Sequence, residues 1–463
     1  MSITPRTRRI VLICLLVVLA AMYGVAWFTP AIGLAYSDGV ALVQAVTHHI
    51  DPYPPLFPWL LGVFALVSRQ GQWLKVLPLA CTLGWLALTK RLLVKMGASR
   101  ECSWVLVALT AVSPTVLYLG TGLFAESLFA LLTTACLLAL LDDQPLVAGV
   151  CAGLAAITIT AGATLIAACL LTLAHRRFRS ALVFMFASMV FAAPWLGWWL
   201  AHGGVPASKL HLSELAVLLG RNVMLLAAAP FTLLSGYANL YPGLLTAVAL
   251  LIVLVRRRQF VPDLFFGFYC LTLLFRTEPP LQAFAPVLPM FLWILWRVAR
   301  GGRFALITKA AAVAMVVPAL WFGVAGLTRP ARSRSDDWSQ MEKLFAFIRG
   351  TTAADAVTMA DLDPVFYLNT DRRTIRGFQA DSYRSYYAPP GPLVTPDELR
   401  ASVLRERVNY VIVTPDRDLP ESPWFHRAVA AMERGGILEP VSVAGVSQEY
   451  RVLRVVQSDL NHR

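Results

Sequence analysis

The stretch Tyr36-Ser37-Asp38-Gly39, followed by His48-His49-Ile50-Asp51-Pro52-Tyr53-Pro54-Pro55-Leu56-Phe57-Pro58, decides how this chain folds. It comes directly after the first apolar segment and places two carboxylates, Asp38 and Asp51, at a membrane surface. The apolar segment that follows, Leu56–Val67, is too short to cross a bilayer. Because carboxylates are costly near hydrocarbon, this loop is a candidate functional site, and a merely solvated loop is the alternative.

The composition is that of an integral membrane protein. Only 14% of the 463 residues are charged, and the mean hydropathy is +0.63. Apolar runs of about 18 residues or more recur along the chain, which is the signal of a membrane-spanning helix; examples are Ile10–Phe28, Ala181–Leu200 and Phe304–Leu327.

The net charge of +13 belongs entirely to the apolar part of the chain. Residues 328–463 hold 18 basic and 18 acidic residues, whereas residues 1–327 hold 22 basic and 9 acidic residues. The basic residues cluster at the ends of apolar runs, as in Arg6-Thr7-Arg8-Arg9 and Arg256-Arg257-Arg258. This is the positive-inside pattern of a membrane protein, and it does not indicate a nucleic-acid partner.

The charge pattern also predicts the topology. With Arg6–Arg9 in the cytoplasm, the first helix places Asp38 and Asp51 in the periplasm of a bacterial inner membrane. We expect Leu56–Val67 to lie at the interface, because Lys90 and Arg91 then stay on the cytoplasmic side. About eleven spans follow from the alternation, and an odd number places the C-terminus outside.

Four segments give expectations that a structure can test. We expect one span over Cys102–Leu119 and an outer loop over His202–Asn222. The apolar stretch Leu146–Arg176 should hold two short helices that turn near Thr160–Gly162, because both of its flanks are cytoplasmic. The last span, Phe304–Leu327, completes a transmembrane domain over residues 1–327.

Residues 328–463 predict a small soluble α/β domain in the periplasm. Helices are expected over 336–349, 396–407 and 423–434, and strands over 356–359, 410–413 and 450–456, because apolar residues recur there with helical or strand periodicity. Alternating helices and strands are typical of an α/β module.

Asp38 is the strongest candidate for a catalytic group. A carboxylate at a partly dry interface can have a raised pKa and accept a proton from a hydroxyl nucleophile. The alternative is that Ser37 or Asp38 only caps the helix that follows.

His48, His49 and Asp51 are candidate ligands of a divalent cation, together with Asp38, because imidazole and carboxylate groups suit such ions. Adjacent helical residues point about 100° apart, so at most one of the two histidines would bind together with Asp51. An exposed polar loop is the alternative.

Glu126 and Arg276 are the next candidates. Glu126 lies one turn inside the outer end of its helix, where an ionisable group usually faces a cavity or a partner; stabilisation by the helix dipole is the alternative. Arg276 lies in an outer polar turn and suits phosphate recognition, unless it only pairs with Glu278. The sequence contains no Walker loop, GxGxxG, GxSxG or HExxH motif.

The order of these features resembles the GT-C glycosyltransferases, and more narrowly the bacterial branch related to lipid A aminoarabinose transferases and protein mannosyltransferases. The resemblance rests on the Asp38 loop, the Pro54-Pro55-Leu56-Phe57-Pro58 segment with its short helix, and many further spans. Three more stretches agree: Ala125-Glu126-Ser127-Leu128, Phe284-Ala285-Pro286-Val287-Leu288-Pro289, and Phe347-Ile348-Arg349-Gly350-Thr351 with Tyr367-Leu368-Asn369-Thr370.

The resemblance implies an inverting sugar transfer on the outer face of the membrane. The donor would be a polyprenyl-phosphate-linked sugar, the acceptor a glycan, lipid or protein, and Asp38 the base. Aminoarabinose transferases carry Glu-Lys before the Pro-Pro-Leu segment, where this chain has Pro52-Tyr53. Tyr53, Arg276 and Arg221 are therefore the candidates for the donor phosphate, while Asp51, His48 and Glu126 would support the acceptor or a metal.

Two other classes of protein compete with this interpretation. A transporter or flippase usually has ionisable residues near the middle of the membrane and inverted repeats, and this sequence shows no repeat. A non-catalytic envelope scaffold, whose C-terminal domain binds a periplasmic partner, is the third interpretation.

Overall fold

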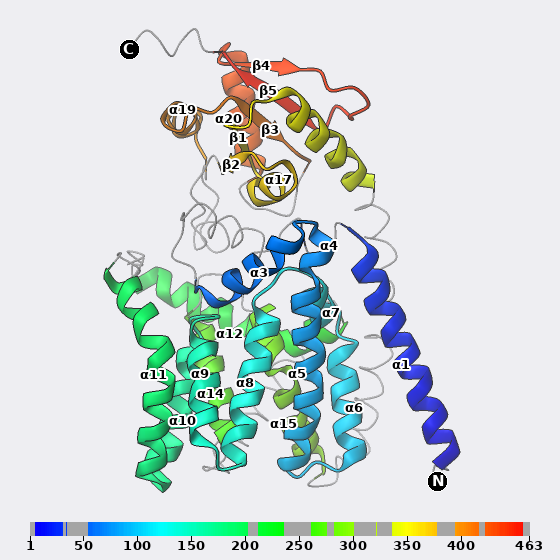
Figure 1. Cartoon of the computed structure of the whole chain (residues 1–463), viewed down its shortest axis with the longest axis vertical. Coiled ribbons are helices and arrows are strands. Elements are labelled where there is room, and N and C mark those ends of the chain that lie inside the picture. The colour runs from blue at the N-terminus through cyan, green and yellow to red at the C-terminus, as the bar shows by residue number, and fades with distance from the viewer. Residues whose placement is uncertain are drawn as a thin grey trace.

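The computed structural model describes residues 5–30, 34, 54–201, 212–235, 261–275, 282–300, 321, 336–376, 394–415 and 422–456. Helices form a bundle, and a small sheet with its own helices lies at one end of it (Figure 1). The elements of the bundle are α1 (Pro5–Phe28), α3 (Leu56–Val67), α4 (Gly71–Leu74), α5 (Val76–Lys95), α6 (Arg100–Ala111), α7 (Pro114–Thr121), α8 (Glu126–Leu141), α9 (Pro145–Ala156), α10 (Gly162–Arg176), α11 (Phe178–Ala201), α12 (Leu212–Ser235), α14 (Val261–Leu274), the 3₁₀ helix η1 (Gln282–Val287) and α15 (Leu288–Arg300).

The helices have the composition of membrane spans. Among the described residues, Gly71–Lys95 and Phe178–Trp198 are long and apolar enough to cross a membrane. A third span exists if α6 and α7, which bend by 68° at their junction, are counted together. The architecture is that of a polytopic helical membrane protein with a small C-terminal sheet, and the number of eleven spans stays a prediction.

The short helix predicted after the first outer loop is confirmed. Helix α3 covers Leu56–Val67 and ends where Ser68 becomes extended. The backbone N–H of Leu56 donates to the carbonyl of Ile157 at 3.0 Å, which ties the start of α3 to the turn between α9 and α10. Phe57 and Leu61 of α3 are fully buried. As a result α3 lies across the end of the bundle that faces the sheet (Figure 1).

The predicted span Cys102–Leu119 is helical but is broken between α6 and α7, because Ser113 caps α7 and Pro114 occupies its first position; counted together, the two helices pass as one bent span. One prediction about the bundle is wrong. The expected outer loop His202–Asn222 is helical from Leu212 onward, since α12 begins there. The polar residues of α12 concealed its helical pattern. The expected pair of short helices in Leu146–Arg176 is confirmed by α9 and α10.

Helices α9 and α11 pack closely through two glycines. A Cβ atom built on Gly149 would lie 2.5 Å from the carbonyl oxygen of Phe184, and one on Gly153 would lie 2.5 Å from that of Ser188. Small residues four apart on one face let two backbones approach in a membrane, where packing rather than hydrophobicity drives helix association. This contact fixes the α9–α10 turn, on which α3 rests.

The two ends of the bundle differ in the charged residues that they carry. At the end away from the sheet, Lys95 pairs with Asp142, Arg177 pairs with Asp143 at 2.6 Å, and Arg297 pairs with Asp263 at 3.4 Å. The opposite end carries α3, α4 and the turn between α7 and α8 (Figure 1). This segregation agrees with the predicted alternation, in which these acids share one side and Glu126 lies on the other.

The C-terminal part contains a five-stranded sheet of order β2-β1-β3-β5-β4. Strand β1 (Val357–Ala360) pairs in parallel with β2 (Arg373–Ile375) and β3 (Tyr410–Val413), whereas β5 (Arg451–Val455) is antiparallel to β3 and β4 (Leu438–Val441). The accompanying helices are 336–351, α17 (Asp363–Thr370), α19 (Pro396–Arg405) and α20 (Ser422–Arg434). The expected small α/β unit is therefore present, although α17, β2 and β4 were not predicted.

Contacts join this sheet unit to the bundle. One apolar cluster includes Phe57 and Leu61 of α3 and continues to Trp338, Phe345 and Phe366. Arg69, just after α3, pairs with Asp371, just after α17. The predicted domain boundary at residue 327 and the last predicted span, Phe304–Leu327, fall outside the described residues, apart from Trp321.

Candidate active site

The candidate site is the end of the bundle that α3 covers. Beneath α3, apolar side chains from several elements meet in one cluster; these are Leu74 at the end of α4, Leu77 near the start of α5, Leu123 and Ala125 in the turn before α8, and Leu128 in α8. Because this packing is dense, the few polar groups at this end are held in fixed positions. Among the described residues here, two charged side chains are buried, those of Glu126 and Lys75.

Glu126 is placed in the first turn of α8, with a side chain that is 92% buried. The next residue, Ser127, donates to the carbonyl of Leu119 at 3.1 Å and accepts from Thr82 at 3.0 Å. These bonds fix the rotation of α8 at this point. The N-terminal helix dipole favours a carboxylate at this position. Because α8 begins here, Glu126 lies at the end of the bundle that the sequence predicted.

Lys75 is a buried basic residue that the sequence analysis missed. It lies between α4 and α5, and its side chain is fully buried. Its Nζ donates to the carbonyl oxygen of Thr29, just after α1, at 2.9 Å. No carboxylate of the described residues forms an ion pair with it. A desolvated ammonium with a neutral partner is costly, which makes Lys75 the most unusual basic residue at this end of the bundle.

The described residues that flank the segment with the predicted catalytic residues lie at this end on both sides. On one side, Thr29 accepts from Lys75, and Leu34 is buried against Gly71, where a Cβ atom would lie 2.6 Å from the Leu34 Cδ1. On the other side, Leu56 is bonded to Ile157. The chain therefore leaves and re-enters the described structure at the same end as Lys75 and Glu126.

The other predicted site residues stand as follows. Asp38, His48, His49, Asp51, Tyr53 and Arg276 lie outside the described residues. Arg221 is exposed on α12, where its neighbour Asn222 occupies the buried face and donates to the carbonyl of Leu274 at 3.0 Å. Within the described ranges, no group of three or more histidine, cysteine or acidic side chains is arranged to hold a metal ion.

Two structures of one protein are among the solved structures that match the whole fold. The crystal structure of ArnT from Cupriavidus metallidurans bound to undecaprenyl phosphate matches 96% of this chain and 98% of its own, with a TM-score of 0.57 and 13% sequence identity. The apo form of the same protein matches over the same shares, with a TM-score of 0.56 and 12% identity.

The chain therefore has the same overall fold as ArnT. A weaker likeness, with a TM-score of 0.49 and 11% identity, relates 86% of this chain to 69% of the archaeal oligosaccharyltransferase AglB from Archaeoglobus fulgidus. No protein-family model matches the sequence. No curated protein matches it either.

The charge pattern of the sequence also marks the position of Lys75 as unusual. Lysine at the outer end of a span runs against the positive-inside rule. In this chain Lys75 opens Val76–Lys95, whose opposite end carries the expected basic residues Lys90, Arg91 and Lys95. A lone buried lysine at the end facing the sheet is therefore a better candidate for phosphate contact than the exposed Arg221.

Proposed function

We propose that this protein is a glycosyltransferase that moves a sugar from a polyprenyl-phosphate-linked donor to an acceptor on the periplasmic face of a bacterial inner membrane. The observation that carries the proposal is the GT-C fold over 96% of the chain, combined with a fully buried cation, Lys75, at the end that α3 covers. The ArnT structure with undecaprenyl phosphate shows that this fold can hold a lipid phosphate.

The proposed reaction is a single displacement. The acceptor hydroxyl attacks C1 of the donor sugar, the bond between C1 and the phosphate oxygen breaks, and polyprenyl phosphate leaves, so the configuration at C1 inverts. Asp38 takes the proton from the hydroxyl. Asp38 is four residues from the buried Leu34, a chain reach of at most about 14 Å.

Lys75 would stabilise the phosphate that leaves. A positive charge in a water-excluded site is worth more to a developing anion than the same charge in water. Arg276 and Tyr53 are further proposed phosphate contacts, whereas the exposed Arg221 is a weaker one. Glu126 would support the acceptor or a metal.

Asp38, Asp51 and one of the histidines offer oxygen and nitrogen ligands for a divalent cation. Among the described residues Glu126 could add one carboxylate, but no complete ligand set is present there.

The test is sugar transfer in inverted and right-side-out vesicles that contain a radiolabelled pool of polyprenyl-phosphate sugar. We expect label to reach an acceptor with the wild type and not with Asp38→Asn. The matched control is Asp143→Asn, which removes an exposed carboxylate at the opposite end of the bundle and should transfer normally. Equal transfer by Asp38→Asn and the wild type would refute the role of Asp38, and transfer by neither, with folded protein, would favour a transporter or a scaffold.

A further inference from the structure

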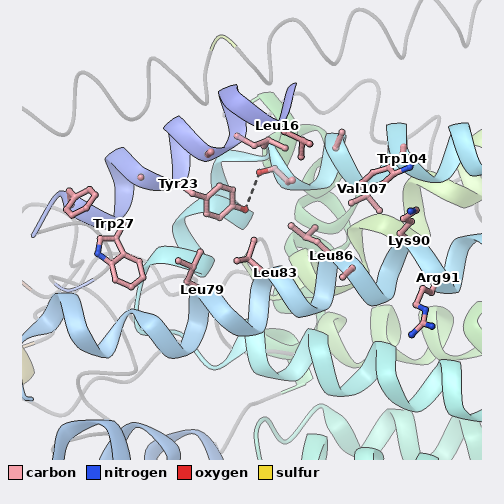
Figure 2. Close-up of a pocket in the computed structure, with 17 residues that line it drawn as sticks. Leu16, Tyr23, Trp27, Leu79, Leu83, Leu86, Lys90, Arg91, Trp104 and Val107 are labelled. Atoms are coloured by element: carbon pink, nitrogen blue, oxygen red, sulfur yellow. Dashed lines mark hydrogen bonds between the residues drawn. The ribbon is translucent and has the colours of Figure 1, made fainter. Parts of the chain in front are cut away.

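A long apolar groove runs between α1, α5 and α6, separate from the candidate active site. It has a volume of about 880 Å³. Its walls are leucine, alanine, valine and aromatic side chains, including Leu16, Leu83, Leu86 and Val107 (Figure 2). Leu16 and Leu83 are about half exposed, so the groove is open at the surface of the bundle.

The groove is charged at one end only. Lys90 and Arg91 lie at the same end of it, and Trp27 lies at the other (Figure 2). Lys90 is held with its Nζ 3.9 Å from the centre of the Trp104 ring, a cation–π contact that keeps the ammonium at the groove mouth. Arg91 is exposed and forms no ion pair among the described residues. The neighbouring Lys95, by contrast, is paired with Asp142.

Apart from Lys90 and Arg91, the polar side-chain groups in this wall are uncharged. The hydroxyl of Tyr23 donates to the carbonyl of Ala111 at 3.3 Å, which ties α1 to the end of α6, and the others are the indole groups of Trp27 and Trp104. Lys90 and Arg91 are therefore the cations in this wall that can bind an anionic group of a ligand.

The dimensions fit one leaflet of a membrane. From Leu79 to Lys90 the wall of α5 rises about 17 Å, at 1.5 Å for each residue. The hydrocarbon core of a bilayer is about 30 Å thick, so the groove is about as deep as one leaflet. Its charged end lies at the end of the bundle away from the sheet, where the basic clusters gather (Figure 1).

We propose that this groove binds an anionic glycerophospholipid of the leaflet at the Lys90 end, with the phosphate on Lys90 and Arg91 and an acyl chain along α1 and α5. Basic pockets between membrane helices on the cytoplasmic side are a recognised form of anionic lipid site. The charge lies at the wrong end for the sugar donor, whose phosphate would be placed beside Lys75. The site is thus distinct from the proposed active site.

The test is native mass spectrometry of the full-length protein, purified in detergent, delipidated and titrated with phosphatidylglycerol or with phosphatidylcholine of the same chains. Each basic residue near a lipid surface contributes about fivefold in affinity. Lys90→Gln with Arg91→Gln should therefore weaken phosphatidylglycerol binding by about thirtyfold, and phosphatidylcholine should bind no better to the wild type than to this variant. Ala87→Trp, which fills the groove without removing charge, should also abolish the tight adduct.

Matched controls separate the groove from the rest of the surface. Arg179→Gln removes a cation near the start of α11, and Val190→Trp adds the same bulk on an exposed face of α11; both should bind phosphatidylglycerol as the wild type does. Unchanged affinity in both groove variants would overturn the proposal. Displacement of phosphatidylglycerol by polyprenyl phosphate at equal or lower concentration would also overturn it, because the groove would then belong to the sugar donor. No sugar transfer is measured, so either result is independent of the proposed reaction.

Discussion

Replacing Lys75 by methionine removes a buried ammonium and keeps most of the side-chain volume. In the wild type this ammonium is fully buried and donates to the carbonyl of Thr29 at 2.9 Å. If the phosphate of the donor lies about 4 Å from the Nζ, an effective dielectric constant of about 20 gives an attraction of about 4 kcal/mol. This corresponds to about a thousandfold in kcat/KM, since 1.36 kcal/mol is a factor of ten.

The thermal stability of the same variant should be unchanged or higher, although its transfer activity falls. Lys75 loses its hydration on folding and gains a single described hydrogen bond, to a neutral carbonyl. Replacing such a group by an apolar side chain of similar size is often neutral or stabilising. We therefore expect Lys75→Met to fold with an unchanged or higher midpoint of thermal unfolding, while transfer falls by about a hundredfold to a thousandfold.

The assay measures transfer of radiolabelled sugar in vesicles, together with thermal unfolding in detergent. Lys343→Met is the matched control, because the Nζ of Lys343 also donates to a backbone carbonyl, that of Gly445 at 2.6 Å, but is exposed in the sheet unit. It should transfer at the wild-type rate. Normal transfer by Lys75→Met would refute the phosphate role.

An alternative is that Lys75 is needed only to hold Asp38. In that case Lys75→Met, Asp38→Asn and the double variant would lose transfer equally, since residues that act as a unit are strongly non-additive. Independent roles on phosphate and hydroxyl predict losses that multiply. A loss of transfer that tracks a loss of stability would refute both interpretations.

Two further predictions concern stability. Gly153→Ala should lower the free energy of unfolding in detergent by about 1–3 kcal/mol, because its Cβ would lie 2.5 Å from the Ser188 carbonyl; Gly197→Ala in α11, where nothing lies within 4 Å, should not destabilise. An equal effect of both changes would contradict close packing at Gly153. Burial raises the pKa of Asp363 to about 6, although the Arg376 guanidinium opposes the shift. Since the folded pKa exceeds the unfolded one, the sheet unit should lose up to about 3 kcal/mol as pH rises from about 4 to 6 and change little above that. Hydrogen exchange of β1 and α17 should show this loss in the wild type and not in Asp363→Asn, and identical pH profiles would contradict it.

Sequence patterns predicted the elements whose boundaries are set locally. Helix α3 was predicted to the residue because prolines precede it and polar residues follow its twelve apolar ones. The paired short helices α9 and α10 followed from the charges on their flanks. Strand β3 was predicted over Tyr410–Val413 because it is a short apolar run in a polar domain.

The elements that were missed depend on tertiary contacts. Helix α12 carries Arg221 and Asn222 within its length, and its buried face is polar at Asn222 because the Leu274 carbonyl accepts a hydrogen bond there. A pattern of apolar residues cannot reveal such a partner. The break between α6 and α7 was visible as Ser113-Pro114, a cap followed by a first-turn proline, but the apolar run on both sides concealed it.

The candidate site shows the same division between local and tertiary information. A carboxylate in a loop, such as Asp38, stands out because its surroundings in the sequence are polar. Lys75 lies next to a long apolar helix, and from the sequence alone we would expect its ammonium group to extend to the membrane surface. The structure instead buries it completely, between the end of α1 and the start of α5. A buried ammonium without a charged partner often makes a fold less stable than methionine at the same position would. The burial of Lys75 at the end that α3 covers is therefore the strongest physical reason to propose that an anionic substrate binds there.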